Sequence, residues 1–581
     1  MAYKEKYPSE LLSQAVEAPR VAVLHPIESF WLLFGPVDKT LPRRQEMDEQ
    51  FENLAQWLLY GGLDFDYLSE AMLPDLCPAG SNPLRVGQCE YEAVVVPPVI
   101  TLRSTTLQRL AAFRQAGGRL IFLGGAPECV DGLPSNEPAA LWKESERLPM
   151  ERSRLLKALL PLRDIEIRNE KDGRISDNLI YQLRREGEER VLFLCHVKDE
   201  KPARPRVYRI RLKGLWQALR LNALDGTVSP MGGVQEGGET VLLWPCDAQD
   251  SLLLRLTPGA CASPALLPKP LHTVKTLFEA NEFTLDEPNA LLLDRCEYAL
   301  DEGEWHAAEN VLRADNALRA LARLPRRDGV MVQPYLTPPQ KAEHTASLRF
   351  RFWADRPFAG LRLAVEQPEK TEIFLNGERI ASPAEGWYVD EAIKTLPLPD
   401  VKEGENVLLL RAPLTLRTDL EAVYVLGRFG VRVAGTRLTL TALPDRLALD
   451  DLTRQGLPFY TGNVRYAFSL ELEKDAPRLY LHLPHMASPV SAVFVDGKES
   501  GKIAWQPYRT QLPPLKAGRH RVEINCCGSR YNGFGTLHNA NPNYVWYGPD
   551  SFRTTGDDWT DNYLVRPSYL LSPAELMEEN E

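Results

Sequence analysis

The sequence predicts a multidomain protein that combines one α/β domain with several all-β domains. Three features of its 581 residues indicate this organisation. Near the N-terminus, short apolar segments alternate with helical patterns, as in a parallel sheet covered by helices on both faces. From about residue 140 onward, short strands are separated by turn residues. A strand–turn–strand unit then occurs twice, which indicates two whole domains of one type rather than a solenoid.

The α/β domain is expected over residues 20–135. Its predicted strands are Arg20–Pro26, Asp64–Ser69, Tyr91–Pro98 and Arg119–Pro127. Helical patterns at Pro42–Gly61 and Thr101–Ala116 separate them, and this alternation implies βαβ units. Residues 1–19 are expected to be a linker or the remnant of a connecting helix, so Met1 is interpreted as an internal start or a boundary.

The all-β part is expected to hold three domains. A small β-sandwich is predicted over residues 136–260, with turn signals such as Asp225-Gly226 between its strands. A linker rich in proline and alanine follows at 261–274. The repeated unit then predicts two domains, at 275–435 and 436–575.

The repeated unit resembles a known sugar-binding module. Its first copy contains Phe374-Leu375-Asn376-Gly377 and its second contains Phe494-Val495-Asp496-Gly497. Each segment leads from a strand into a tight turn and a second strand. This arrangement resembles the galactose-binding-like jelly roll that serves as the sugar-binding domain of glycoside hydrolase family 2. The resemblance implies two jelly rolls.

Other segments extend the resemblance over most of the chain. They are Leu420–Val431, Gln455–Tyr466, Ser529–Asn539 and Trp559–Val565. Their order is similar to the C-terminal half of large bacterial glycosidases, including α-L-rhamnosidases of glycoside hydrolase family 106. The N-terminal domain resembles the flavodoxin-like domain that follows the catalytic barrel in those enzymes and in family 42 β-galactosidases.

The resemblance implies polysaccharide or oligosaccharide breakdown, but it carries over no catalytic residue. Glycoside hydrolysis needs two carboxyl groups, which in the resembled enzymes sit on an upstream (β/α)8 barrel. Such a barrel takes about 200 residues at least, and only the residues before Arg20 precede the first predicted strand. We therefore expect no (β/α)8 barrel in this sequence, and an accessory portion that scaffolds a barrel and binds glycan.

Three alternatives stay open at this stage. The protein is an α-L-rhamnosidase-like or β-galactosidase-like glycosidase whose barrel lies outside this sequence, or it is a stand-alone carbohydrate-binding protein. A third reading, a flavodoxin-like enzyme acting on a small molecule, is weaker, because the loop His25–Pro36 lacks a run of Gly, Ser or Thr whose backbone N–H groups could cradle phosphate.

Candidate binding residues follow from what sugars require, which is aromatic faces and hydrogen-bonding side chains. The sugar-binding candidates are Trp505, Tyr508, Arg509, Asn532, His538, Asn539, Tyr544, Trp546, Tyr547 and Trp559. By the resemblance, His25 and Glu28 could line a cleft beside a barrel. For both sets, packing within or between domains is the competing interpretation.

Composition limits the partners. The net charge of −11 and the lack of a long basic run argue against nucleic acid and anionic membrane surfaces. An oligosaccharide or plant-type glycan and a separate or upstream catalytic barrel are the expected partners. Nine cysteines without a CxxC pair indicate free thiols and no zinc site.

The N-terminus lacks an apolar signal region and no segment reaches the roughly 20 apolar residues of a membrane helix, so a cytoplasmic location is expected. No cofactor is expected. The resembled jelly rolls often hold a structural calcium, but no acidic loop here supplies a recognisable ligand set.

Overall fold

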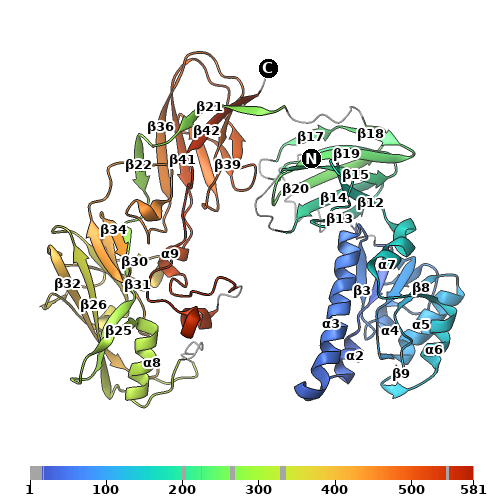
Figure 1. The fold of residues 1–581 in the computed structure, drawn as a ribbon, viewed down its shortest axis with the longest axis horizontal. Helices are drawn as coiled ribbons and strands as arrows, with labels where there is room; N and C mark the ends of the chain where they lie inside the picture. Colours follow the sequence, from blue (N-terminus) through green and yellow to red (C-terminus); the bar gives the residue numbers. More distant parts are fainter. Residues whose placement is uncertain are drawn as a thin grey trace. The chain divides into compact units, whose positions relative to one another are not determined.

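The computed structural model describes residues 16–17, 19–198, 205–223, 226–261, 269–327, 335–544 and 548–579. The chain divides into two compact units, Met1–Pro268 and Lys269–Glu581. In Figure 1 the first unit runs from blue to green and the second from green to red. Among the described residues, no helix combines the length and the apolar character needed to cross a membrane.

The first unit begins with the predicted parallel sheet. From one edge to the other its strands are β3 (Phe65–Leu68), β2 (Val21–Leu24), β6 (Ala93–Val96), β8 (Arg119–Leu123) and β11 (Glu146–Leu148). All four neighbouring pairs are parallel. This is the 2-1-3-4-5 order of doubly wound sheets, in which helices cover both faces. The fifth strand lies beyond residue 135, where the sequence placed the domain boundary.

Helices bury both faces of this sheet, as Figure 1 shows for its blue part. The helices are α2 (Ile27–Leu32), α3 (Val37–Tyr60), α4 (Leu73–Leu76), α5 (Ser104–Gln115), α6 (Glu137–Glu144) and α7 (Arg152–Leu159). Leu54 and Leu58 of α3 pack with Val21 and Val23 on one face. Leu110 of α5 packs on the other face. Strands that are buried on both sides explain why their sequence is continuously apolar.

Shorter strands complete this α/β part. β4 (Leu84–Val86) and β5 (Cys89–Tyr91) form a hairpin, and β7 (Thr101–Leu102), β9 (Cys129–Val130) and β10 (Leu133–Pro134) form a small separate sheet. The described residues contain no closed barrel.

The rest of the first unit is a two-sheet sandwich. One sheet contains β1 (Val16–Glu17), β13 (Leu179–Glu186), β14 (Glu189–His196), β20 (Ser251–Pro258), β16 (Trp216–Leu221) and β17 (Val228–Met231). The other contains β12 (Ile165–Asn169), β15 (Arg206–Lys213), β19 (Glu239–Cys246) and β18 (Gly233–Glu236). Trp244 and Tyr208 are fully buried between them. Val16–Glu17 forms a strand, where a linker or the remnant of a helix was expected. Residues 262–268 of the predicted linker at 261–274 lie outside the described residues.

The second unit contains two further sandwiches. The first has one sheet of β23 (Asn289–Leu293), β33 (Val423–Gly427), β27 (Arg362–Glu366), β31 (Asp390–Pro397) and β30 (Trp387–Tyr388). Its other sheet contains β25 (His306–Asn310), β24 (Arg295–Leu300), β26 (His344–Ala354), β32 (Gly404–Leu414), β28 (Glu372–Leu375) and β29 (Glu378–Arg379), with β34 (Gly430–Ala434) and β35 (Arg437–Thr441) attached to it. Helix α8 (Val311–Leu321) packs against the same core.

The second sandwich takes strands from both ends of the unit. One sheet is β22 (Glu282–Leu285), β36 (Val464–Leu472), β41 (Gly518–Cys526), β38 (Ser491–Val495) and β39 (Lys498–Ile503). The other is β21 (Leu271–Leu277), β42 (Ala574–Glu579), β37 (Leu479–His482) and β40 (Arg509–Gln511). The strands over Leu271–Leu285 therefore pair with the later domain, although the sequence assigned them to the linker and the earlier one.

Between β41 and β42 the chain returns to the first sandwich. Helix α9 (Tyr531–Phe534) packs its Phe534 ring against Tyr388 and Tyr424. Leu537 and Tyr563 enter the first core. Figure 1 shows this crossing segment in red, running from the strands of the second sandwich to the side of α8. We call residues 529–570 the crossing segment.

The two copies of the repeated turn have matching geometry. Asn376 and Asp496 adopt positive φ angles of 52° and 50°, and the glycines after them have φ of 87° and 79°. These are the conformations that a two-residue hairpin turn requires. In each copy the turn residue also bonds the next long strand, because the Val407 N–H donates to Asn376 Oδ1 (2.9 Å) and the Arg521 N–H donates to Asp496 Oδ1 (2.8 Å). The predicted turn is confirmed in both copies.

Candidate functional site

The predicted sugar-binding residues divide into two groups in the structure. Trp505, Tyr508 and Arg509 lie at the edge of the second sandwich, between β39 and the start of β40. Trp505 is 47% exposed. Tyr508 packs against the second core, and its N–H donates to the Trp505 carbonyl (3.0 Å). Trp505 is therefore the member of this group that presents its ring to solvent.

Two asparagines of the other group hold the backbone of the crossing segment. Asn532 Nδ2 donates to the Arg566 carbonyl (2.8 Å), and Asn532 Oδ1 accepts from the Arg566 N–H (2.9 Å). Asn539 donates to the Ser551 carbonyl (3.3 Å) and accepts from the Asn541 N–H (3.0 Å). These amides order the loops on which the remaining candidates lie.

His538 and Trp559 lie together on the first sandwich. His538 Nε2 is 3.0 Å from Asp294 Oδ2, and His538 Nδ1 is 2.9 Å from the Thr560 carbonyl oxygen. The Trp559 ring stacks on His538 with 5.2 Å between centroids. The Arg313 guanidinium carbon lies 3.6 Å from the centroid of the same tryptophan ring. Both candidates are thus fixed by their neighbours.

The loop that follows Asn539 supplies the last three aromatic candidates. Tyr544 is half-buried and interacts with other residues. Trp546 and Tyr547 lie outside the described residues.

His25 and Glu28, the predicted cleft-lining pair, lie in the first unit just after β2. The Glu28 carboxylate pairs with Arg103 (2.7 Å). The His25 ring packs edge-on against Phe51 and Tyr67, with centroids 5.4 and 6.0 Å away. In this unit both side chains contribute to packing around the end of the parallel sheet.

A cavity of about 230 Å³ opens beside His538 and Trp559. We call it the Glu421 cavity, because Glu421 is its one lining acid without a hydrogen-bond partner among the described residues. Aromatic side chains form much of its wall, and they are Tyr424, Phe534, Phe552 and Trp559. Its polar lining residues are Asp294, Asn310, Thr536, His538, Asn539 and Ser551.

Most of those polar groups are already engaged. Asp294 accepts from His538 and, through its other oxygen, from the Tyr563 hydroxyl (2.7 Å). Asn310 caps α8 by accepting from the Leu312 N–H (3.1 Å). Glu421 therefore remains as the group that can meet a ligand.

Burial raises the pKa of Glu421 to about 8, and the carboxylates of Asp419 and Glu366 add to this shift. At pH 7 the group is a neutral acid with one O–H donor and a carbonyl acceptor. Strongly perturbed acids in cavities are typical of functional sites. The arrangement suits a polar, uncharged ligand with an apolar face.

Sequence analysis did not single out Glu421, although it lies within Leu420–Val431, a segment used for the family resemblance. A local signal was present, because the acid directly precedes an apolar stretch that forms β33. Among the described residues, no three His, Cys, Asp or Glu side chains gather as metal ligands.

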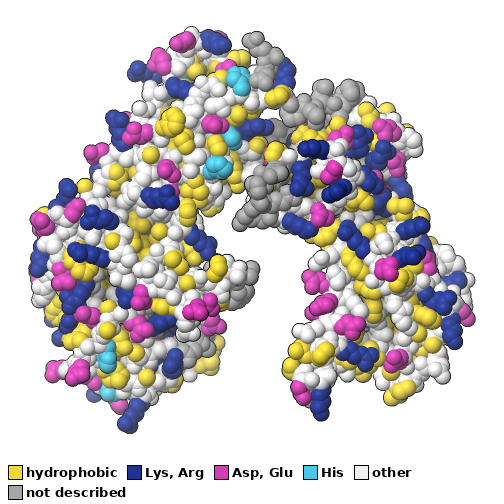
Figure 2. Space-filling view, viewed as in Figure 1, with side chains coloured by type: hydrophobic (Ala, Val, Ile, Leu, Met, Phe, Trp, Pro, Cys, Tyr) yellow, Lys and Arg dark blue, Asp and Glu magenta, His cyan; other side chains and the backbone are white. Residues whose placement is uncertain are grey.

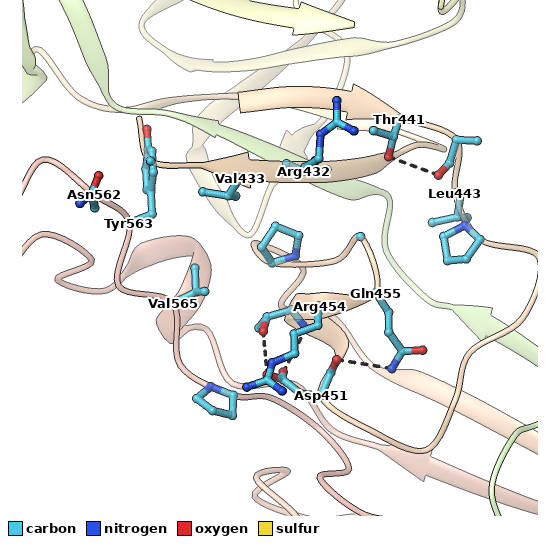
Figure 3. A pocket seen from close by; sticks show the side chains of 18 of the residues that line it. Arg432, Val433, Thr441, Leu443, Asp451, Arg454, Gln455, Asn562, Tyr563 and Val565 are labelled. Carbon is cyan, nitrogen blue, oxygen red and sulfur yellow. Dashed lines mark hydrogen bonds and ion pairs between the residues drawn. The ribbon is translucent and has the colours of Figure 1, made fainter. Parts of the chain in front are cut away.

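A larger and more open cleft of about 1170 Å³ lies elsewhere in the second unit. Figure 3 shows Arg432 and Thr441 on one wall and Asp451, Arg454 and Gln455 on the other. Asp451 accepts from the backbone and the hydroxyl of Thr453 (3.0 and 2.8 Å). Tyr563 is the one aromatic residue among those that line this cleft, whereas four aromatic residues line the Glu421 cavity.

Comparisons with known proteins give distant structural likenesses. No family model and no curated protein matches the chain. A rhamnosidase from Novosphingobium sp. PP1Y aligns with 98% of this chain at 13% identity and a TM-score of 0.49. A GH42 β-galactosidase from G. stearothermophilus (10% identity, TM-score 0.28) covers 42% of this chain and 42% of its own length. An α-L-fucosidase from Paenibacillus thiaminolyticus (12%, TM-score 0.28) covers 44% of this chain and 51% of its own.

These structural neighbours are glycoside hydrolases. The chain spans 40% of the length of the rhamnosidase.

Proposed function

We propose that this chain is the carbohydrate-binding and scaffolding portion of a glycoside hydrolase, and that it holds a sugar in the Glu421 cavity. The observation that carries the proposal is the position of Glu421, a half-buried acid with a raised pKa and without a hydrogen-bond partner among the described residues, in a cavity with aromatic walls.

The chemistry of the cavity matches the chemistry of a sugar. A sugar ring has an apolar face that packs on aromatic side chains and hydroxyls that need both donors and acceptors. Tyr424 and Trp559 supply aromatic surface, and Glu421 supplies a donor and an acceptor. Pockets for drug-sized ligands begin at about 300 Å³, so a cavity of about 230 Å³ suits one sugar unit at the end of a glycan.

Titration with single sugars tests the binding role. We expect one or more neutral monosaccharides, such as L-rhamnose or D-galactose, to bind the purified chain in a calorimetric or NMR titration. Glu421→Leu should weaken that binding about tenfold, the effect of losing one or two hydrogen bonds. Glu378→Gln, a change at an exposed acid of the same sandwich, is the matched control. Unchanged binding by Glu421→Leu would overturn the assignment of the site.

A second candidate function is hydrolysis in the same cavity. Asp294 and Glu421 both line it, and glycoside hydrolysis needs one protonated and one ionised carboxyl group. Against this role, both oxygens of Asp294 accept hydrogen bonds from His538 and Tyr563. Turnover of aryl α-L-rhamnoside or β-galactoside that disappears in Glu421→Gln would favour catalysis, and no turnover would favour binding.

The scaffolding role has its own test. If a catalytic barrel of the same system is the partner, adding this chain should raise the melting temperature or activity of the isolated barrel. A chain that binds sugar but has no effect on such a barrel would support the stand-alone carbohydrate-binding protein.

A further inference from the structure

A separate cavity in the first unit is lined by two arginines, Arg185 and Arg190, that form no ion pair with any residue the structure describes. It has a volume of about 580 Å³ and lies between the parallel-sheet part and the sandwich of that unit. We call it the Arg190 cavity. Arg185 of β13 and Arg190 of β14 line it together with Trp216 and Lys213. Figure 2 shows Lys and Arg side chains, interspersed with acidic ones, over the strands of this sandwich.

Arg185 and Arg190 are placed directly opposite each other. They are cross-strand partners in the antiparallel β13–β14 pair, so their side chains share one face. Like charges in this position are destabilising. Burial, and secondarily the facing Arg185, lower the pKa of the Arg190 guanidinium. Glu188 and Asp164 act in the opposite direction on Arg190.

The adjacent position of the same hairpin shows how a like-charge pair is normally balanced. Glu186 and Glu189 are also cross-strand partners. Arg255 bridges them, with its Nε 2.6 Å from Glu189 and its terminal nitrogen 3.0 Å from Glu186. No described carboxylate bridges Arg185 and Arg190 in this way.

The arginine pair is held in position by its surroundings. Arg190 donates to the Glu189 carbonyl (3.0 Å), and its guanidinium carbon lies 5.4 Å from the centroid of the Trp216 ring. Arg185 makes no hydrogen bond or ion pair with any residue that the structure describes. A guanidinium ordered on an aromatic ring keeps free N–H groups in a planar fork.

The acidic residues that line the cavity bond to groups other than Arg185 and Arg190. Glu92 pairs with Arg20 through two contacts of 2.6 and 2.9 Å, and Asp164 lies 3.4 Å from the same arginine. Glu90 pairs with Arg85 (2.9 Å). The fourth acid, Asp64, accepts from the Phe65 N–H (3.0 Å). Arg185 and Arg190 are therefore lining cations with which none of these carboxylates forms an ion pair.

We propose that the Arg190 cavity binds an acidic sugar, whose carboxylate or sulfate group lies between Arg185 and Arg190. The arginine pair indicates that the bound group is an oxyanion, because a guanidinium group forms paired hydrogen bonds with carboxylate or sulfate oxygens. That the oxyanion belongs to a sugar rests on the proposed function. The site lies in the first unit and is distinct from the Glu421 cavity in the second.

The test compares ligands that differ only in charge. The probes are a uronic-acid disaccharide, a sulfated disaccharide, the neutral parent disaccharide and sodium sulfate, each titrated into the whole chain at low and high NaCl. We expect one or both acidic disaccharides to bind more tightly than the neutral one and than sulfate, with affinity falling as salt rises. The two acidic probes decide whether the anion is a carboxylate or a sulfate.

Variants locate the binding. Arg185→Gln and Arg190→Gln should each weaken acidic-disaccharide binding about tenfold. Arg209→Gln, at an arginine of the same sandwich that is already paired with Glu170, should leave it unchanged. Glu421→Leu should also leave it unchanged, which separates this site from the neutral-sugar site.

Folding of the variants is checked by melting temperature. Removing one of two facing cations relieves repulsion, so Arg185→Gln should melt at or above the wild-type temperature. Adding the acidic disaccharide should raise the melting temperature of wild type, Arg209→Gln and Glu421→Leu equally, and that of Arg185→Gln and Arg190→Gln by less. The proposal is overturned if acidic and neutral disaccharides bind alike or if both arginine variants bind as wild type does. Binding of single-stranded RNA through the same arginines, without acidic-sugar binding, would also overturn it.

Discussion

His538 Nε2 lies 3.0 Å from Asp294 Oδ2, and this contact ties the crossing segment to the start of the first sandwich. The two side chains are 5% and 10% exposed. Asp294 also accepts from the Tyr563 hydroxyl (2.7 Å), so one carboxylate anchors two residues of the crossing segment. The same contact holds His538 and Trp559 at the wall of the Glu421 cavity.

Removing this carboxylate should therefore destabilise the second unit strongly. Asp294→Ala leaves the His538 ring and the Tyr563 hydroxyl buried without their acceptor, and breaking such a buried pair costs about 3–5 kcal/mol. Chemical denaturation of the chain measures the loss. Glu282→Gln, which removes an exposed pair with Arg521, should cost at most about 1 kcal/mol. Equal losses in the two variants would contradict the anchoring role.

Glu421 should make the stability of the second unit depend on pH. Its pKa rises from an ordinary value of 4.5 to about 8 on folding. Between these values the folded chain keeps a proton that the unfolded chain releases, so stability falls as pH rises, by about 1.4 kcal/mol per pH unit. Above pH 8 this loss levels off. The glutamine in Glu421→Gln cannot ionise, so this variant should lose the part of the pH dependence of stability that Glu421 causes. Chemical denaturation at pH 5, 7 and 9 measures this dependence, with Glu378→Gln as the control.

The sequence predicted those parts of the fold that local patterns determine. The parallel sheet follows from apolar strands between helices, and the repeated turns follow from Asn376-Gly377 and Asp496-Gly497. In contrast, the pairing of Leu271–Leu285 with the second sandwich could not be predicted. An alternating strand shows which of its faces is buried, but not which sheet it joins.

The candidate site was predicted only in part for a similar reason. His538 and Trp559 do line a cavity, whereas Trp505 and Tyr508, close to them in sequence, lie on another sandwich. The crossing segment, which carries His538 and Trp559, contains few regular elements and leaves no periodic signal. Glu421 was missed because its raised pKa depends mainly on burial, and also on Glu366, which only folding brings near it.

Substitution of the turn glycine should destabilise the two copies of the repeated turn to the same extent. Gly377→Ala and Gly497→Ala place alanine at φ of 87° and 79°, respectively. This conformation should lower the free energy of unfolding by about 1 kcal/mol when the residue is not glycine. Open space surrounds both positions, so the cost is conformational rather than steric. Gly125→Ala, also in open space but without a positive φ, is the control and should be nearly neutral. A neutral result at both turns would show that their left-handed geometry is not required.

Sugar binding in the Glu421 cavity should depend on pH in a way that Glu421→Gln removes. Below pH 8 the neutral acid offers a donor and an acceptor, and a glutamine amide offers both as well. Above pH 8 wild-type Glu421 loses its O–H donor, and its charge favours hydration over contact with a sugar ring. We therefore expect monosaccharide affinity measured by calorimetry to fall between pH 7 and pH 9 in wild type and to stay constant in Glu421→Gln. If the affinity of the two proteins depends on pH in the same way, Glu421 does not contact the ligand. The open cleft lined by Asp451 and Gln455 would then be the next candidate site.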